Sequence, residues 1–416
     1  MSVNLNPLDY YRLPWNYADN AISWLEPTTV CNLRCEGCYR DFDSQQHKSL
    51  EEVRAELELF RKLRKSDCIS IAGGDPLVYP HIVELVGIIR SMGWKPIINT
   101  NGLALDEPLL RKLKEAGVYG FTLHVDSTQH RPDSPATTET ELNDLRLKFA
   151  RMLSEAGNIA CSFNATVSEK TLHEVPALVE WARQHAGLVQ TMVFILFRSP
   201  GLTGEFDYYA RGEKIEMGQV YKESEWGGEK FLMAQDVVDT IREADPAYEP
   251  CAFLNGTANP ASFKWLLANR TVFAGRTAGY MSPLMMELIQ AANHLFTGKY
   301  LSYASPRATS LGKATALLGS LFDRASRKTL LTILKQAVSR PASALSTAHM
   351  QSIMIIQPVN FEADGRQDMC DSCPDITVHE GKLVWSCRLE ELRNYGDFVT
   401  TVPKSCSSRG LPGEAR

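Results

Sequence analysis

The sequence has no uncharged apolar run that approaches the ~20 residues needed to cross a bilayer, so no membrane-spanning helix is expected. It also has no excess of positive charge. A net charge of -5 and a pI near 6.0 argue against a general nucleic-acid-binding protein. Ten cysteines among 416 residues are too few for a disulfide-stabilised scaffold, and the N-terminus lacks the basic start and apolar core of a secretory signal.

The composition is that of an ordinary globular protein, with 44% hydrophobic and 22% charged residues. A chain of this length has room for two or three domains. Several cysteines fall into groups that are spaced like metal ligands, which indicates a reducing compartment. We therefore expect a cytoplasmic protein.

One short stretch, TTVCNLRCEGCYR at residues 28–40, carries Cys31, Cys35 and Cys38. Thiolates are soft ligands, and three of them on one loop can converge on a single metal centre. With three protein thiolates, one iron of a four-iron cluster keeps a position open for a small molecule. Zinc is the alternative, but structural zinc sites usually need four ligands in paired Cys-x2-Cys units.

Cys-x3-Cys-x2-Cys is the signature of the radical S-adenosylmethionine (radical SAM) enzymes, and CNLRCEGCY resembles many of them. The resemblance implies a [4Fe-4S] cluster on Cys31, Cys35 and Cys38, with S-adenosylmethionine (SAM) bound at its open iron. One electron then cleaves SAM to methionine and a 5'-deoxyadenosyl radical, which abstracts hydrogen from a substrate. The family often has an aromatic residue before the third cysteine. Here that position is Gly37, and Tyr39 is the candidate to replace the aromatic contact.

Short apolar strands alternate with helical segments over roughly the first 200 residues. This alternation predicts an α/β fold with a parallel sheet and right-handed crossovers. Six strands match the partial (βα)6 TIM-like barrel that the resemblance implies, although a doubly wound sheet also fits the pattern. The predicted strands are 21–30, 68–72, 96–99, 120–125, 159–167 and 189–197, and the predicted helices are 49–64, 81–91, 107–115, 139–155 and 172–185.

Further candidates follow the predicted strands. Gly73, Gly74 and Asp75 resemble the family's GGEP motif, in which the backbone binds the amino group of SAM; a plain Gly-Pro turn is the alternative. Asn101 ends the third strand. The fourth strand carries His124 and Asp126 on one face, as candidates to move a proton or contact substrate, or as a buried ion pair. The remaining cofactor-binding candidates are Ser127, Asn164 and Arg198, with Thr166 beside Asn164.

The pattern changes after Ser199. Residues 200–228 indicate a connector or lid, residues 235–243 a helix, and residues 255–265 a turn leading into a helix. Residues 281–350 contain eight Lys or Arg against two acids, a net charge of +6, and apolar residues at helical spacing. Such helices can lie on an anionic membrane or cover an apolar substrate channel. They can equally be a packed pair with a solvated basic face.

The C-terminal region holds a second cysteine group, Cys370, Cys373 and Cys387, around a hairpin-like turn at Glu380-Gly381. It resembles the SPASM/twitch extensions of radical SAM enzymes, which implies one auxiliary [4Fe-4S] cluster. Cys406 is the preferred fourth ligand and Cys251 the alternate. A zinc or single-iron site is the other interpretation. Cys68 and Cys161 fall in predicted strands and are expected in the core.

The predicted organisation is an N-terminal surface segment (1–20), a radical SAM barrel (21–200), a connector with basic amphipathic helices (201–350) and an auxiliary-cluster region (351–416). The predicted function is reductive SAM cleavage and hydrogen abstraction, with flavodoxin or ferredoxin as electron donor. Because the first cysteine is at residue 31, no peptide-recognition domain is expected before it, which favours a small-molecule or lipid substrate. A peptide-modifying maturase and a non-enzymatic zinc protein remain as alternatives.

Overall fold

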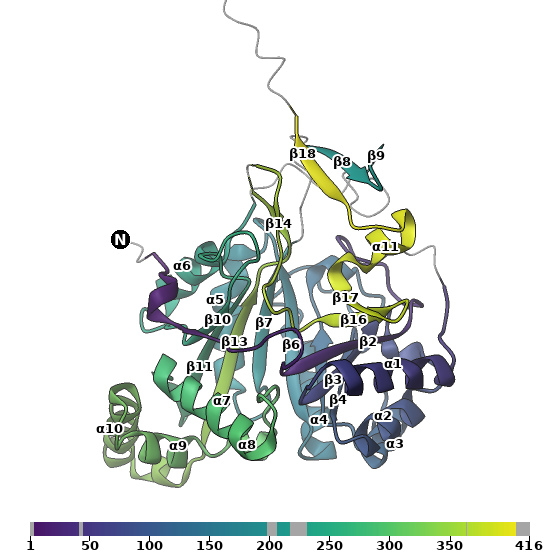
Figure 1. Ribbon diagram of the computed structural model, residues 1–416. Helices are drawn as coiled ribbons and strands as arrows, with labels where there is room; N and C mark the ends of the chain where they lie inside the picture. The colour runs from purple at the N-terminus through teal and green to yellow at the C-terminus, as the bar shows by residue number, and fades with distance from the viewer. Residues whose placement is uncertain (1–3, 41–44, 198–205, 217–230, 363, 405–416) are drawn as a thin grey trace, which may run out of the picture.

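The computed structural model describes residues 4–40, 45–197, 206–216, 231–362 and 364–404 (Figure 1). Six parallel strands pair in chain order, as the sequence predicts. They are β2 (Ile22–Thr28), β3 (Cys68–Gly73), β4 (Lys95–Thr100), β5 (Gly120–His124), β6 (Ala160–Val167) and β7 (Thr191–Leu196). The connecting helices are α1 (Leu50–Leu63), α2 (Ile82–Ser91), α3 (Glu107–Ala116), α4 (Asn143–Ala156) and α5 (Val175–Gln184).

The first helix shows how local sequence positions these elements. Ser49 and Glu52 form the predicted capping box at the start of α1. Val53, Leu57 and Phe60 are fully buried at helical spacing, so one face of α1 packs on the sheet. Cys68 and Cys161 are buried in strands, as predicted.

The main sheet continues beyond β7 with strands from the second half of the chain. β13 (Ala348–Ile356) pairs parallel with β7, and β11 (Trp265–Phe273) pairs antiparallel with β13. The sheet then adds β10 (Ala252–Leu254), β12 (Arg276–Tyr280) and β1 (Tyr11–Arg12). In the described ranges no strand joins β2 to the opposite edge, so the barrel is partial and open. The predicted helix leading to residue 265 is wrong, because this segment enters the long strand β11.

Helices from the middle of the chain cover the lower end of this sheet in Figure 1. They are α7 (Pro283–Thr297), α8 (Pro306–Thr309), α9 (Gly312–Gly319) and α10 (Arg324–Ser339), while α6 (Ala234–Ala244) packs near α5. The boundaries expected at residues 200 and 350 do not separate structural units, because β10 to β13 belong to the main sheet. None of the helices in the described ranges has the length and apolar character that a bilayer crossing requires.

The C-terminal region folds over the carboxyl ends of the barrel strands. The Glu380-Gly381 turn joins β16 (Ile376–His379) to β17 (Lys382–Trp385), and both turn residues have positive φ, so the predicted hairpin is confirmed. The other elements are β14 (Asn360–Phe361), β15 (Gln367–Asp368), α11 (Leu389–Tyr395) and β18 (Thr400–Pro403), which pairs with β8 (Phe206–Ala210); β9 (Glu213–Ile215) completes that small sheet.

A buried arginine, Arg64, fastens this region to the barrel. It follows α1, and its guanidinium donates to four backbone carbonyls, those of Tyr17, Ile22, Cys373 and Pro374. Burial lowers the pKa of Arg64 to about 10, so the group stays charged near neutral pH. A buried charge with several carbonyl partners holds those backbone segments in one geometry.

We expect Arg64→Leu to destabilise the fold by about 3 kcal/mol, because it leaves without a donor the buried carbonyls that now accept charge-assisted hydrogen bonds. Urea unfolding under anaerobic conditions measures this loss. Arg61→Leu on the same helix is the matched control. Arg61 pairs with Glu58 on the surface, and its loss should cost less than about 1 kcal/mol. Equal effects of the two substitutions would contradict the anchoring role of Arg64.

Candidate functional site

The cysteine loop follows the carboxyl end of β2 and faces a cavity of about 300 Å³. Cys31, Cys35 and Cys38, the proposed cluster ligands, line this cavity. The second cysteine group, more than 330 residues later in the sequence, lines the same cavity. Its members are Cys370, Cys373 and Cys387.

Gly73 and Gly74 allow the loop after β3 to lie directly against the start of the cysteine loop. A Cβ on Gly74 would lie 2.1 Å from the Val30 carbonyl oxygen, and one on Gly73 would lie 2.2 Å from that of Thr28. The Gly74 and Asp75 amides donate to these same carbonyls of Thr28 and Val30. The glycines are therefore required for the close backbone approach that shapes this wall of the cavity.

The Asp75 carboxylate ties two strand ends together. It accepts hydrogen bonds from the Leu77 amide, the Thr100 hydroxyl and the Asn101 amide. Burial raises the pKa of Asp75, and these donors oppose the rise. The side chain of Asn101 in turn donates to Asn32 in the cysteine loop at 2.7 Å. Asp75 thus positions Asn101 and the cysteine loop, in addition to lining the cavity.

The aromatic contact near Gly37 comes from a residue that the sequence did not single out. Gly37 has a φ of 69°, and a Cβ there would lie 2.3 Å from the ring of Phe197, which follows β7. Phe197 and Tyr39 both line the cavity. Two aromatic side chains therefore flank the third cysteine, and one of them occupies the space over Gly37.

His124 lines the cavity and forms a close pair with Asp126, which is buried and does not line it. Nε2 of His124 lies 2.5 Å from the Asp126 carboxylate and 3.2 Å from the Thr166 hydroxyl. Burial opposes protonation of the imidazole, but the Asp126 carboxylate prevails and raises the pKa of His124. For Asp126, burial acts against ionisation, yet His124 and hydroxyl donors such as Thr128 hold its pKa below the usual range. Both shifts favour a protonated imidazole paired with an ionised carboxylate.

Other predicted site residues have mixed placements. Asn101 and Asn164 line the cavity, and Oδ1 of Asn164 is buried without a hydrogen-bond partner. Ser127 does not line it; its amide donates to Glu139 instead. Arg198 and Cys406 lie outside the described residues.

Cys251 is buried elsewhere, where its thiol donates to the Leu267 carbonyl, and it is absent from the cavity wall. The sequence analysis missed Phe197, Thr128, Gln129 and Asp375, all of which line the cavity. Phe197 directly follows β7, and Thr128 and Gln129 lie in the loop after β5, which is a usable signal, whereas nothing local marks Asp375.

The C-terminal cysteines lie close enough to affect one another. A hydrogen bond with Cys370, together with burial, raises the pKa of the Cys373 thiol, and Cys387 adds to the effect. Asp375 follows two residues later, and burial raises its pKa to about 7 against the opposing charge of Arg64. Burial on this wall of the cavity therefore favours the protonated forms of Cys373 and Asp375.

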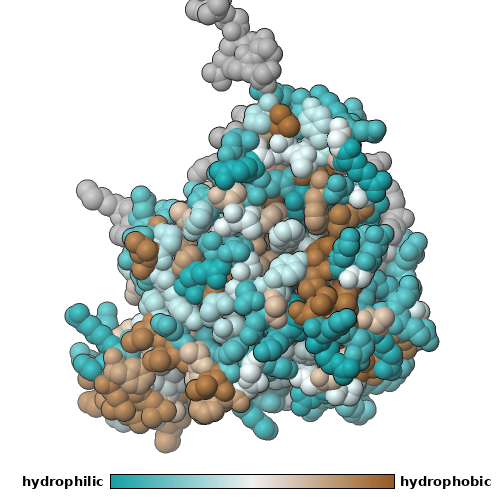
Figure 2. All heavy atoms as spheres, viewed as in Figure 1, coloured by the Kyte–Doolittle hydropathy of each residue, from teal (hydrophilic) through white to brown (hydrophobic). Residues whose placement is uncertain are grey.

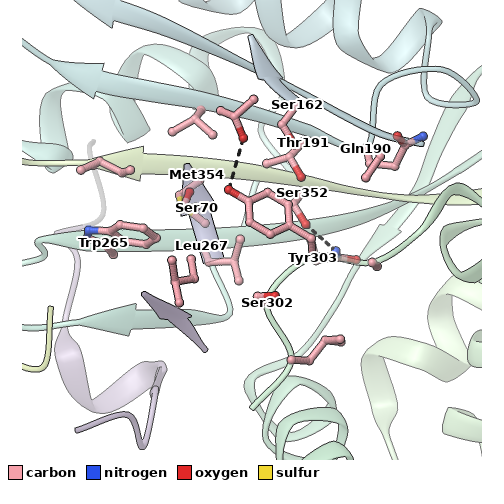
Figure 3. A pocket seen from close by; sticks show the side chains of 18 of the residues that line it. Ser70, Ser162, Gln190, Thr191, Trp265, Leu267, Ser302, Tyr303, Ser352 and Met354 are labelled. Atoms are coloured by element: carbon pink, nitrogen blue, oxygen red, sulfur yellow. Dashed lines mark hydrogen bonds between the residues drawn. The ribbon is translucent and has the colours of Figure 1, made fainter. Parts of the chain in front are cut away.

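A second cavity of about 230 Å³ lies deeper in the barrel and shares wall residues with the first, among them Asn99, Thr122, Asn164 and Asp375. Figure 3 shows Tyr303 projecting into it; its hydroxyl lies 3.3 Å from that of Thr122. We call this cavity the inner chamber. Its lining is mostly apolar, with small hydroxyl and amide groups on the strands. Of the described residues that line it, only Asp375 is ionisable with a charge near neutral pH.

The donor chemistry fits an iron-sulfur cluster at the first cysteine group. As placed, no three His, Cys, Asp or Glu side chains among the described residues are arranged as a formed metal site. However, burial raises the pKa of the Cys35 thiol, and the nearby Cys38 thiolate raises it further. The Leu33 amide also donates to Cys31 Sγ. Thiolates that are costly to ionise alone are stabilised by a bound cationic metal centre.

Comparisons with known proteins identify this part of the chain. Residues 25–182 match the Radical SAM superfamily. The Fe-coproporphyrin III synthase of Methanosarcina barkeri is 26% identical over 37% of this chain and 38% of its own length. The GTP 3',8-cyclase of Chlorobaculum tepidum is 31% identical over 40% of this chain and 51% of its own.

Among solved structures, methylornithine synthase is 15% identical to this chain. The match covers 56% of this chain and 63% of the synthase chain, with a TM-score of 0.38. A likeness this low carries no argument. Residues 25–182 are a radical SAM domain, a class that implies a [4Fe-4S] cluster and SAM. The chain spans only 38% to 58% of the length of the curated relatives that it matches.

We expect Gly74→Ala to disrupt the cysteine loop, because the new Cβ would overlap the Val30 carbonyl. Iron bound after anaerobic reconstitution should fall severalfold. Gly87→Ala in α2 is the control, since a Cβ there meets nothing within 4 Å. That change should keep iron binding and stabilise the helix by about 0.5–1 kcal/mol. Wild-type iron content in Gly74→Ala would contradict the close-approach argument.

We expect the pH dependence of stability to reveal the His124–Asp126 pair. Because the folded pKa of His124 is raised above its unfolded value, its contribution is complete below the unfolded pKa of about 6.5 and is lost as pH rises through the folded value. The free-energy difference between wild type and His124→Gln should therefore shrink on going from acid to alkaline pH. Urea unfolding at a series of pH values measures it. In an Asp126→Asn background this pH dependence should largely disappear, and its persistence would contradict the pairing.

Proposed function

We propose that this protein is a radical SAM enzyme that cleaves SAM reductively and abstracts hydrogen from a substrate, with help from an auxiliary iron-sulfur cluster. One observation carries the proposal: two cysteine groups from opposite ends of the chain face one cavity, together with the Gly73-Gly74 loop. A structural zinc protein gives no reason for this convergence on an open cavity, since structural sites are closed.

The chain's own residues have distinct roles in this proposal. Cys31, Cys35 and Cys38 hold the cluster, which when bound supplies the single electron that cleaves SAM. The loop at Gly73 and Gly74 offers backbone groups to SAM, and Asn101 adds a polar side chain. His124 and Asp126 hold a proton at Nε2 that can be transferred to or from the substrate.

The second cysteine group is proposed to hold the auxiliary cluster. Cys370, Cys373 and Cys387 supply three thiolates, which leaves a coordination position for Cys406 or for substrate. Cys251 is the weaker alternate, because its thiol is engaged in the core. An external donor such as flavodoxin or ferredoxin is proposed to deliver the electrons.

The inner chamber favours a small-molecule or lipid substrate whose buried part is uncharged. The wall is mostly apolar, and the described residues that line it include no Lys or Arg. A nucleoside triphosphate, as in the GTP 3',8-cyclase relatives, would need cationic partners for its phosphates. The orphaned Ser162 hydroxyl and Asn164 carbonyl offer two hydrogen-bonding positions for such a substrate. Peptide modification is the second candidate, because a chamber of about 230 Å³ has room for a single side chain.

Anaerobic reconstitution followed by iron and sulfide analysis, then incubation with SAM and dithionite, tests the proposal. We expect about eight irons per chain and the formation of 5'-deoxyadenosine. The Cys31→Ser, Cys35→Ser and Cys38→Ser triple variant should lose product formation and keep about four irons. The matching variant of Cys370, Cys373 and Cys387 should also keep about four irons but still cleave SAM.

Each result distinguishes a different alternative. Zinc in place of iron, with SAM intact, would overturn the enzyme proposal. Four irons in wild type with normal SAM cleavage would remove only the auxiliary cluster.

A further inference from the structure

The helix pair α9 and α10 packs against the barrel mainly with small and polar residues, together with the apolar Ile333 of α10. Gly312, Ala316 and Gly319 are the buried positions of α9. On α10 the buried positions are Ser326, Thr329 and Ile333, at helical spacing. This is the reverse of an ordinary surface helix, which buries its large apolar side chains.

The large apolar side chains of this pair instead point outward. Leu321 is 77% exposed, and Leu331 and Val338 are 52% and 81% exposed. Figure 2 shows the resulting brown patch at the lower left, over the helices that Figure 1 labels α9 and α10. We call this patch the leucine face, and it consists of Leu317, Leu318, Leu321, Phe322, Leu331, Leu334 and Val338. A contiguous exposed apolar patch of this kind marks an interaction surface.

The charge around the leucine face has one sign. Residues 311–340 contain six Lys or Arg and a single acid, Asp323. Asp323 is 5% exposed and is the N-cap of α10. Its carboxylate accepts hydrogen bonds from the Ser326 amide and the Ser282 hydroxyl. Lys328 and Lys335 are exposed and lie at helical spacing with Leu331 and Val338 on α10. Cations and apolar side chains thus share one side of the helix.

We propose that the leucine face docks on a membrane surface that contains anionic lipid. Apolar side chains enter the boundary between headgroups and acyl chains, while the flanking cations contact the negative headgroups. A second copy of this chain fits less well, because a two-fold interface would place the same cations opposite one another. The contact is peripheral and in the plane of the membrane, and it does not depend on the proposed radical chemistry.

Flotation of the full-length protein with vesicles tests this docking. The wild type should float with vesicles of phosphatidylcholine and phosphatidylglycerol, and bind much less to phosphatidylcholine alone. Added salt should weaken the binding, because the headgroup attraction is screened. The Leu331→Gln, Leu334→Gln, Val338→Gln variant should bind at least about tenfold more weakly. A Lys328→Gln, Lys335→Gln variant should lose the preference for anionic vesicles.

Two controls make the outcome decisive. Leu8→Gln changes a leucine that is 91% exposed elsewhere on the protein, and it should leave vesicle binding unchanged. Iron content and thermal unfolding of each variant show whether it folds as the wild type does. The proposal is overturned if the wild type ignores anionic vesicles, or if the leucine-face variant binds them equally well. A wild-type dimer that the same variant converts to a monomer, without vesicle binding, would assign this face to self-association instead.

Discussion

Burial of two guanidinium groups fixes the relation between the two cysteine segments. A buried arginine remains charged, so each of its donors needs a partner, and any segment that supplies a partner is held in place. Arg64 donates hydrogen bonds to carbonyls of the N-terminal segment, of the start of β2 and of the loop after Cys370. Arg40, two residues after Cys38, pairs with Glu26 of β2 and with Glu390 of α11. Moving the C-terminal region away from the barrel would take Glu390 from Arg40 and the Cys373 and Pro374 carbonyls from Arg64, so each buried charge would lose part of its compensation.

The site combines this rigid attachment with close backbone contact. Gly73 and Gly74 bring the loop after β3 against the cysteine loop, and Asp75 then ties that loop to the end of β4 through Thr100 and Asn101. These contacts all occur at the carboxyl ends of parallel strands, where loops from successive strands meet. Close backbone contacts and short polar side chains shape this wall of the cavity, whereas large apolar side chains such as Trp24, Phe197 and Trp265 line other parts of it. The inner chamber continues from it along the inward faces of the same strands.

The sequence predicted the barrel strands and helices closely because each has a strong local signal, such as the capping box of α1 or the apolar run of β3. It failed where pairing partners are distant. Trp265–Phe273 is an apolar run that periodicity alone cannot assign, and it becomes a strand because β10 and β13 flank it. For the site, cysteine spacing predicted the residues of both groups, and the structure brings these groups to one cavity. The placement of Phe197 over Gly37 and of Asp375 beside both cavities depends on tertiary packing, which no local pattern encodes.

The helical periodicity of residues 311–340 was also correct, yet it did not reveal which face is buried. Packing decides this, because the barrel surface under these helices leaves little space. A Cβ on Gly279 of β12 would lie 2.1 Å from the Thr329 hydroxyl, and one on Gly312 would lie 2.7 Å from the Ala348 carbonyl. Leucine side chains cannot replace such small groups at these contacts, so they must face outward. The same stretch of chain lines the inner chamber at Thr309 and reaches the exposed side chain of Leu311 two residues later. The chain thus passes from the wall of the inner chamber to the exposed surface within two residues, and the small buried side chains of α9 and α10 leave their leucines on that exposed side.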